Sequence, residues 1–181
     1  MEFGEPKKLP DGRYFLKVTN GTHQLNGLVL QGALDTKSVN FAVPEGTDFF
    51  TKIDTEIVEK AKQSSVAWFG KELSSETITN AYQESVTDGS LGASLATVKG
   101  EITTGVFDSQ RNALELSTVK EGTKCDIIME LSGLWFLKKS FGPVWRILQV
   151  RVRGAAVKPV SKEYMFNDEP EDDEDPADFL D

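Results

Sequence analysis

The chain has 181 residues, of which 39% are hydrophobic, and this is enough for one domain with its own core. Cys125 is the only cysteine, which excludes an intramolecular disulfide and a cysteine cluster for zinc. The formal net charge of −9 argues at first against a nucleic-acid partner, but acidic and basic residues are separated along the chain. No stretch approaches the roughly 20 apolar residues of a membrane span, so we expect a soluble, intracellular protein.

The first part of the chain has strand and turn signals. Residues 1–12 contain two prolines and two glycines, and we expect them to form an N-terminal arm. The segment 20–27 is rich in turn residues and predicts a loop. Alternating, aromatic and β-branched residues predict three strands: 13–19, 28–33 and 38–43.

A helical period follows, and it predicts a helical insert at about 47–86. Thr47 or Asp48 can cap the first helix, and Ser74 or Ser75 can cap a second, shorter one. We expect Trp68 and its neighbour Phe69, between the two helices, to pack the insert onto the rest of the domain. The apolar residues at helical spacing are Phe50, Ile53, Ile57 and Ala61 in the first helix, and Ile78 and Tyr82 in the second.

The second half of the chain is again rich in strand signals. A glycine-rich loop at 88–92 leads to an expected strand at 94–102, and a short strand is expected at 112–119. Two long apolar segments then flank a turn that contains Gly142 and Pro143. They predict a long hairpin, with strands at roughly 124–138 and 144–153.

Strands, a helical insert and more strands favour a mainly β fold over a parallel α/β sheet, which would need alternating strand–helix units. We expect an OB-fold-like Greek-key barrel, a five-stranded architecture often used to bind oligonucleotides. The predicted organisation is an arm at 1–12, the OB-fold domain at 13–162 and an acidic, disordered tail at 163–181.

The residue inventory does not support catalysis. The single histidine, His23, is expected in an exposed polar loop, and no second histidine or free cysteine pairs with it in a zinc site or a Cys–His dyad. Phosphate-binding glycine motifs are missing, and the acidic cluster 171–175 lacks the spacing of an EF-hand. We therefore expect a protein that is not an enzyme and has no cofactor or metal.

Charge divides the C-terminal part into two blocks. Residues 163–181 contain ten acidic residues and no basic one. The segment 131–162 has no acidic residue and seven basic ones, which are Lys138, Lys139, Arg146, Arg151, Arg153, Lys158 and Lys162. A basic surface beside a −10 tail indicates a polyanionic partner that the tail can imitate.

Alternation along the second hairpin strand predicts which side chains share a face. Trp145, Gln149, Arg151 and Arg153 would lie together, opposite Leu148 and the valines. Aromatic rings stack on bases and cations follow phosphates, so this mixture suits a single nucleic-acid strand. The alternative is that Trp135, Phe136 and Trp145 all belong to the core, with the arginines on a solvated face.

Two segments carry a resemblance to a known family. "GLWFLKKSFGPVWRILQVRV" (133–152) resembles the signature hairpin of the replicative single-stranded DNA-binding proteins of podovirus-type phages and nucleocytoplasmic large DNA viruses. "AWFGKELSSETI" (67–78) is similar to the helical-insert motif of the large-virus branch. The resemblance implies an OB-barrel that binds single-stranded DNA. The candidate DNA-binding residues are Trp145, Arg151, Arg153, Lys138, Lys139, Gln149, Phe136 and Arg146.

The tail ends in an apolar pair, Phe179–Leu180, that a role in solubility would not explain. A tethered acidic tail can fold back as a phosphate mimic, and DNA would displace it and free the tip. In the family that the chain resembles, the tail contacts the replication machinery, although phage members end on the aromatic residue itself. The candidate docking residues are Asp172, Asp173, Glu174, Asp175, Asp178, Phe179 and Leu180.

We therefore expect a single-stranded DNA-binding protein of viral or phage replication, recombination or repair, located at sites of DNA replication in an infected cell. Replication proteins such as a DNA polymerase or a helicase–primase would be its partners, and a homodimer is compatible with the sequence. Two alternatives stay open. One is an acidic DNA mimic or chaperone-like protein that acts through the tail, and the other is a virion structural protein with no affinity for DNA.

Overall fold

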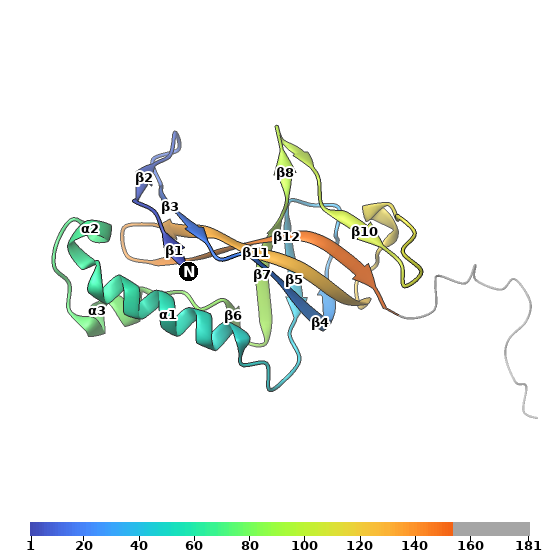
Figure 1. The fold of residues 1–181 in the computed structure, drawn as a ribbon, viewed down its shortest axis with the longest axis horizontal. Coiled ribbons are helices and arrows are strands. Elements are labelled where there is room, and N and C mark those ends of the chain that lie inside the picture. Colours follow the sequence, from blue (N-terminus) through green and yellow to red (C-terminus); the bar gives the residue numbers. More distant parts are fainter. Residues whose placement is uncertain (154–181) are drawn as a thin grey trace, which may run out of the picture.

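The computed structural model describes residues 1–153 (Figure 1). The predicted acidic tail and its docking residues lie outside the described residues, and so do Lys158 and Lys162. Within residues 1–153 no helix is long and apolar enough to cross a membrane.

Five strands form a closed ring. They are β4 (Thr22–Gln31), β5 (Ser38–Ala42), β7 (Ser90–Leu95), β11 (Lys124–Phe136) and β12 (Phe141–Val152). β4, β5 and β7 form an antiparallel meander, β12 lies parallel to β7, and β11 pairs with both β12 and β4. This order, with the fifth strand beside the third and the fourth beside the first, is the Greek-key order of the OB-fold, so the predicted fold class is confirmed.

Shorter strands extend the barrel at two places. β3 (Tyr14–Thr19) pairs with the distal half of β11, and it also pairs with β1 (Glu2–Phe3) and β2 (Lys7–Lys8). Residues 1–12, expected as an arm, therefore hold two short strands of this sheet. β10 (Gly105–Phe107) lies parallel to β12 near its C-terminal end.

Two further short pairings lie around β7. β6 (Val86–Thr87) pairs with β7 itself, and β8 (Thr97–Val98) forms a separate hairpin with β9 (Glu101–Ile102). In Figure 1 the β2–β3 and β8–β9 segments project on the same side of the long β11–β12 hairpin.

The helical insert lies between β5 and β7 and consists of α1 (Phe49–Gln63), α2 (Ser65–Phe69) and α3 (Ser75–Ala81). Ser74 caps α3, because its side chain accepts a hydrogen bond from the amide of Thr77 at 3.1 Å. The predicted apolar face of α1 is confirmed. Its buried residues are Phe50, Ile53, Ile57 and Ala61.

The insert is packed and hydrogen-bonded to the barrel. Trp68 is 8% exposed and contacts Phe136, so its predicted packing role is confirmed. The indole Nε1 of Trp145 donates to Ser85 Oγ at 2.9 Å, and Ser85 Oγ donates to Asp54 Oδ1 of α1 at 2.6 Å. Because these groups lie between elements, they fix the position of α1 over β12.

Four local predictions were wrong. The segment 94–102, expected as one strand, contains the end of β7 and the separate β8–β9 hairpin. The turn-rich segment 20–27 is mostly part of β4, because continuous pairing with β11 outweighs its composition. The glycine-rich segment 88–92 belongs in part to β7, which pairs with β5 along its length. The segment 112–119 forms a 3₁₀ turn at Leu116–Thr118 instead of a strand, since only Ala113 bridges to another strand there.

Candidate nucleic-acid interface

One extra residue in β12 determines which of its side chains point into the core. Ile128 pairs with Gln149 and Met129 pairs with Ile147, so Leu148 is a β-bulge without a partner in β11. A one-residue insertion moves the following side chains to the opposite face. Ile147 therefore points inward before the bulge, whereas Gln149 points outward after it.

The prediction that Trp145 shares the face of Arg151 and Arg153 is therefore wrong. Trp145 precedes the bulge and is 1% exposed inside the core, while both arginines follow it and are exposed. The ring of Trp145 packs edge-on against Phe50, with centroids 5.5 Å apart. A base cannot stack on this ring in the folded protein.

Phe136 is also a core residue, which is a second correction. It is 7% exposed and stacks on Phe141 across the end of the hairpin, with centroids 5.6 Å apart and planes at 5°. Trp68 and Phe69 of α2 contact its ring from the helical insert. The helical insert covers this end of the hairpin and buries Phe136. Alternation along a strand cannot predict which face another element will cover.

The arginines after the bulge share a buried carboxylate. Asp126 is 4% exposed, and it accepts hydrogen bonds from Arg151 at 2.6 and 3.0 Å and from the amide of Gly27 at 3.0 Å. Arg153 forms an ion pair with its other oxygen at 2.6 Å. Burial alone would raise the pKa of Asp126, but these hydrogen bonds and the two positive charges lower it overall.

Arg146 is paired in the same way with Glu130, its cross-strand neighbour on β11. Asp126 and Glu130 lie in the sequence just before the acid-free segment that begins at residue 131. The basic surface expected from that segment is therefore partly neutralised by two carboxylates of the neighbouring strand.

The predicted binding residues form two separate groups. Lys138 and Lys139 are exposed in the turn between β11 and β12, near α2 and α3. Gln149 and Arg151 lie near the opposite end of β12, about 26 Å and about 33 Å from Phe141 at about 3.3 Å per residue. Figure 1 shows the helices at the turn end and β10 at the other end.

A hollow of about 570 Å³, here called the aromatic groove, crosses the outer face of the barrel. It runs from the outward residues of β5 and β7, across β12, to β11 and β3. Its lining combines apolar, hydroxyl, amide and cationic side chains, and includes Arg13, Tyr14, Phe15, Ser38, Asn40, Ser94, Trp135, Pro143 and Val144.

Two rings of the aromatic groove rest against glycines of the neighbouring strand. A Cβ atom at Gly142 would lie 2.9 Å from the indole of Trp135, its cross-strand partner. A Cβ at Gly133 would overlap the ring of Phe15. The glycines thus let both rings approach the sheet, and Trp135 and Phe15 stay half-buried, with ring surface available to a ligand.

Cations lie close to these rings. Lys7 and Lys8 of β2 are exposed and pair across to Phe15 and Tyr14 of β3. Tyr14 is 46% exposed, although large apolar surfaces are usually covered. The strand at 13–19 was predicted, but its aromatic residues were not among the predicted binding residues. The signal was an aromatic pair preceded by basic residues.

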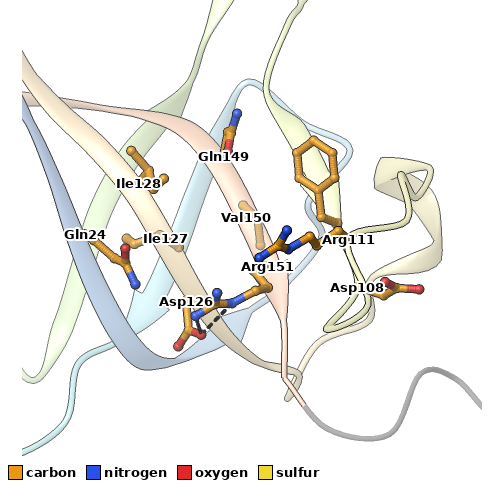
Figure 2. A pocket seen from close by; sticks show the side chains of 10 residues that line it. Gln24, Asp108, Arg111, Asp126, Ile127, Ile128, Gln149, Val150 and Arg151 are labelled. Carbon is orange, nitrogen blue, oxygen red and sulfur yellow. Dashed lines mark hydrogen bonds and ion pairs between the residues drawn. The ribbon is translucent and has the colours of Figure 1, made fainter.

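A second, smaller hollow of about 280 Å³ lies at the other end of β12 and is here called the β10 pocket (Figure 2). Gln149 and Arg151, both predicted as binding residues, belong to its lining. The full set is Gln24, Phe107, Asp108, Arg111, Asp126, Ile127, Ile128, Gln149, Val150 and Arg151.

The structure also places the metal-ligating and nucleophilic side chains of residues 1–153. Residues 1–153 contain no group of three or more His, Cys, Asp or Glu residues that could hold a metal ion. His23 lies in β4 with its ring 5.0 Å from that of Phe49, not in an exposed loop as expected. Burial, with the negative charge of Asp126 beside it, raises the pKa of the Cys125 thiol to about 11, so this thiol is neutral at pH 7.

Comparison with solved structures finds proteins of phages. The single-stranded DNA-binding protein of bacteriophage Enc34, in complex with single-stranded DNA, is 15% identical, with a TM-score of 0.49 over 82% of this chain and 94% of that one. The single-stranded DNA-binding protein gp2.5 of bacteriophage T7 is 11% identical, with a TM-score of 0.46 over 82% of this chain and all of that one (100%). At these scores the likeness carries no argument about function.

Sequence comparison places the chain in a family. No curated protein matches it. Residues 26–168, which include all five barrel strands except the start of β4, match the model of a family described as a family of unknown function (DUF5871). Since this match covers well over half of the sequence, the chain belongs to the DUF5871 family.

Proposed function

We propose that this protein binds single-stranded DNA without sequence preference and protects exposed strands during viral or phage DNA replication, recombination or repair. The observation that carries the proposal is the aromatic groove, where Trp135 and Phe15 rest on glycines of the sheet with Arg13 beside them. In OB-folds, oligonucleotides bind across the face of the second and third strands, which correspond here to β5 and β7.

Each part of the aromatic groove suits a different part of a nucleic-acid strand. Half-buried rings offer stacking surfaces to bases of any kind, because every base has a π-face. Ser38 and Asn40 on β5 offer exposed hydrogen-bonding groups, and Arg13 offers a cation. Arg13 is paired with exposed Asp11 at 2.6 Å, and such a surface pair is weak enough for a phosphate to replace it.

The strand would continue from the aromatic groove along the outer face of β12. Arg146, Gln149, Arg151 and Arg153 all project from that face, and Lys138 and Lys139 would extend the basic surface beyond the turn. Trp135 and Phe15 take the stacking role that the sequence suggested for Trp145 and Phe136.

Replacing Trp135 with alanine should weaken binding to oligo-dT about 5- to 150-fold, since stacking on one aromatic ring contributes about 1–3 kcal/mol. Trp135→Phe keeps a ring and should retain most of the affinity. Trp68 and Trp145 are buried, so quenching of tryptophan fluorescence by DNA should come from Trp135 and vanish in both variants. Normal affinity in a well-folded Trp135→Ala protein would exclude the aromatic groove as the DNA path.

The acidic tail is part of the proposal. Deleting 163–181 should tighten binding to single strands, because a tethered −10 segment competes with phosphates for the basic surface. The gain should shrink as salt rises, since screening weakens the tail. A matched control keeps the tail length but replaces its ten acidic residues with Asn and Gln, and it should behave like the deletion. In the DNA-mimic alternative the tail itself carries the activity. That alternative is favoured if a peptide of residues 163–181 alone binds the basic groove of a partner protein.

When DNA displaces the tail, its tip would be free to recruit replication proteins such as a DNA polymerase or a helicase–primase. Phe179 and Leu180 would form an apolar anchor, and the surrounding acids, Asp172 to Asp175 and Asp178, would steer a basic partner toward it. This recruitment would place the protein at replication sites in an infected cell, as a monomer or a homodimer.

A further inference from the structure

The β10 pocket differs from the aromatic groove in shape and in chemistry. Its volume of about 280 Å³ lies at the lower limit of small-molecule sites, about 300–1,000 Å³, so it suits one compact group better than a length of strand. It lies between β10, the proximal half of β11 and the C-terminal half of β12 (Figure 2).

One wall of the β10 pocket is an aromatic ring. Phe107 is the cross-strand neighbour of Arg151, and a Cβ atom at Gly105 would lie 2.9 Å from its ring. Phe107 therefore also rests on a glycine, but on one of its own strand, two residues earlier. Ile128 adds an apolar side chain from β11. Together they offer a flat, apolar site beside a cationic strand.

Arg111 supplies a cation whose guanidinium is unpaired within the part of the chain that the structure describes. It extends from the loop after β10 toward β12 (Figure 2) and forms no ion pair or side-chain hydrogen bond among residues 1–153. Its backbone has a φ of 68°, in the left-handed region that non-glycine residues seldom adopt. Such backbone strain is often found at binding sites.

Asp108 holds the loop in this conformation. Its Oδ1 accepts the amides of Gln110 at 2.8 Å and Asn112 at 2.9 Å, and its Oδ2 accepts the side-chain amide of Asn112 at 3.0 Å. These hydrogen bonds lower the pKa of Asp108. Because the carboxylate is occupied within its own loop, the guanidinium of Arg111 stays available to an anion from outside.

Two side-chain amides complete the lining. Gln149 forms no side-chain hydrogen bond within the described residues, so both its N–H₂ and its carbonyl are available. Gln24 donates to Asn26 at 3.0 Å and keeps its carbonyl oxygen for a ligand. An amide of this kind matches the paired donor and acceptor on the edge of a nucleobase. The charge of Asp126 is compensated by its arginines.

We propose that the β10 pocket binds a single nucleotide, with its base stacked on Phe107, the edge of the base at Gln149, and its phosphate at Arg111. This inference rests on the proposed function and deepens it. The pocket would capture one base of the bound strand and anchor the strand at this end of β12. It would also add a base preference to binding that is otherwise nonspecific.

The test is a titration of the ¹⁵N-labelled full chain with dAMP, dCMP, dGMP and dTMP, followed by NMR. We expect saturable shifts at the backbone amides around the β10 pocket, with one nucleotide preferred. Deoxyribose 5-phosphate, which lacks the base, and the free nucleosides, which lack the phosphate, should each bind at least about tenfold more weakly.

Variants assign the two contacts. Phe107→Leu should lower the affinity for the preferred nucleotide about tenfold, which is the effect of losing one stacking ring. Arg111→Asn removes the charge but keeps a residue that tolerates positive φ, and it should weaken nucleotide binding while leaving nucleoside binding unchanged. Lys99→Asn is the matched control, because Lys99 is also exposed and has a φ of 50° in the β8–β9 turn. It should bind like the wild type.

The outcomes separate this inference from the proposed function. Two results would overturn the proposed nucleotide site while leaving oligo-dT binding intact. One is chemical-shift changes that map to the aromatic groove instead, and the other is equal affinity for deoxyribose 5-phosphate and for the nucleotides. Unchanged nucleotide affinity in folded Phe107→Leu would overturn it too. If the full chain and the tail-deleted chain both fail to bind oligo-dT, the proposed function fails, whatever the mononucleotides do.

Discussion

Replacing Trp145 with alanine should lower the free energy of unfolding by about 3–5 kcal/mol, the usual cost of removing a large aromatic side chain from a core. Trp145 is 1% exposed, and it is in edge-on contact with Phe50 of α1. Its indole also donates to Ser85, which in turn donates to Asp54. The substitution therefore removes packing from the barrel and a hydrogen bond that fixes the helical insert.

Chemical denaturation followed by circular dichroism measures this loss, and Trp145→Phe is the control. Phenylalanine keeps most of the buried ring but has no N–H group, so the loss should be only about 1–2 kcal/mol. The folded fraction of Trp145→Ala should still bind oligo-dT, because Trp145, although it lies at the base of the aromatic groove, is 1% exposed and offers no ring surface to a base. A fully stable variant with strongly reduced DNA affinity would show that the ring is reached by DNA after all.

Replacing both Arg151 and Arg153 with alanine should change stability as well as DNA binding. Asp126 is buried and, among residues 1–153, would keep only the amide of Gly27 as a partner. Removing the partners of a buried charge costs about 3–5 kcal/mol, and we expect about 3 kcal/mol because the arginine side chains are 52% and 43% exposed. Two lost phosphate contacts should also reduce the slope of log K against log salt by roughly 1.4.

The pH dependence identifies the carboxylate. The pKa of Asp126 is lowered in the wild type, so its contribution to stability is present above the unfolded pKa of about 3.9 and is lost as pH falls through the folded pKa. Without the arginines, burial would raise this pKa, and the variant should gain relative stability at low pH. The stability difference should therefore be smaller at pH 3 than at pH 7.

Lys138→Ala/Lys139→Ala is the matched control for this double substitution. It removes the same charge from an exposed turn, where neither lysine is paired with a described residue. It should leave the free energy of unfolding within about 0.5 kcal/mol of the wild type. If the arginine variant proved as stable as this control at pH 7, the buried network around Asp126 would have no energetic role.

The parts of the fold that sequence analysis predicted well are those with a strong local period. The apolar spacing from Phe50 to Ala61 predicted the buried face of α1, because a helix repeats its contacts every three to four residues. The long apolar segments around Gly142 predicted the β11–β12 hairpin, which spans 124–152. The order of strands and insert was enough to predict the OB-fold.

The candidate site was harder to predict, because it depends on pairing between strands. Strict alternation placed Trp145 outward, and the bulge at Leu148 has no sequence signal that separates it from a regular strand. The partners of Arg146 and Arg151 belong to β11, 16 and 25 residues earlier in the chain. The charge of a segment is therefore a poor measure of the charge of a surface.

Glycine placement was the signal that sequence analysis left unused. Phe15 and Trp135 rest on Gly133 and Gly142, which are adjacent to these rings only across strands, whereas Phe107 rests on Gly105 of its own strand, two residues earlier. Arg111 was missed for a different reason: it lies just before the strand expected at 112–119, and its left-handed backbone depends on hydrogen bonds of Asp108.

The closed ring also determines when the barrel can form. β4 pairs with β11 through residues as far apart as Thr22 and Glu130, and such distant contacts slow folding. The meander of β4, β5 and β7 is complete at Leu95, whereas β12 ends at Val152. At about 5–20 residues per second, a ribosome takes roughly 3–11 s to make the intervening part of the chain. During that time the meander has two unpaired edges and an uncovered apolar face, so the nascent chain is most exposed to aggregation before its last hairpin emerges.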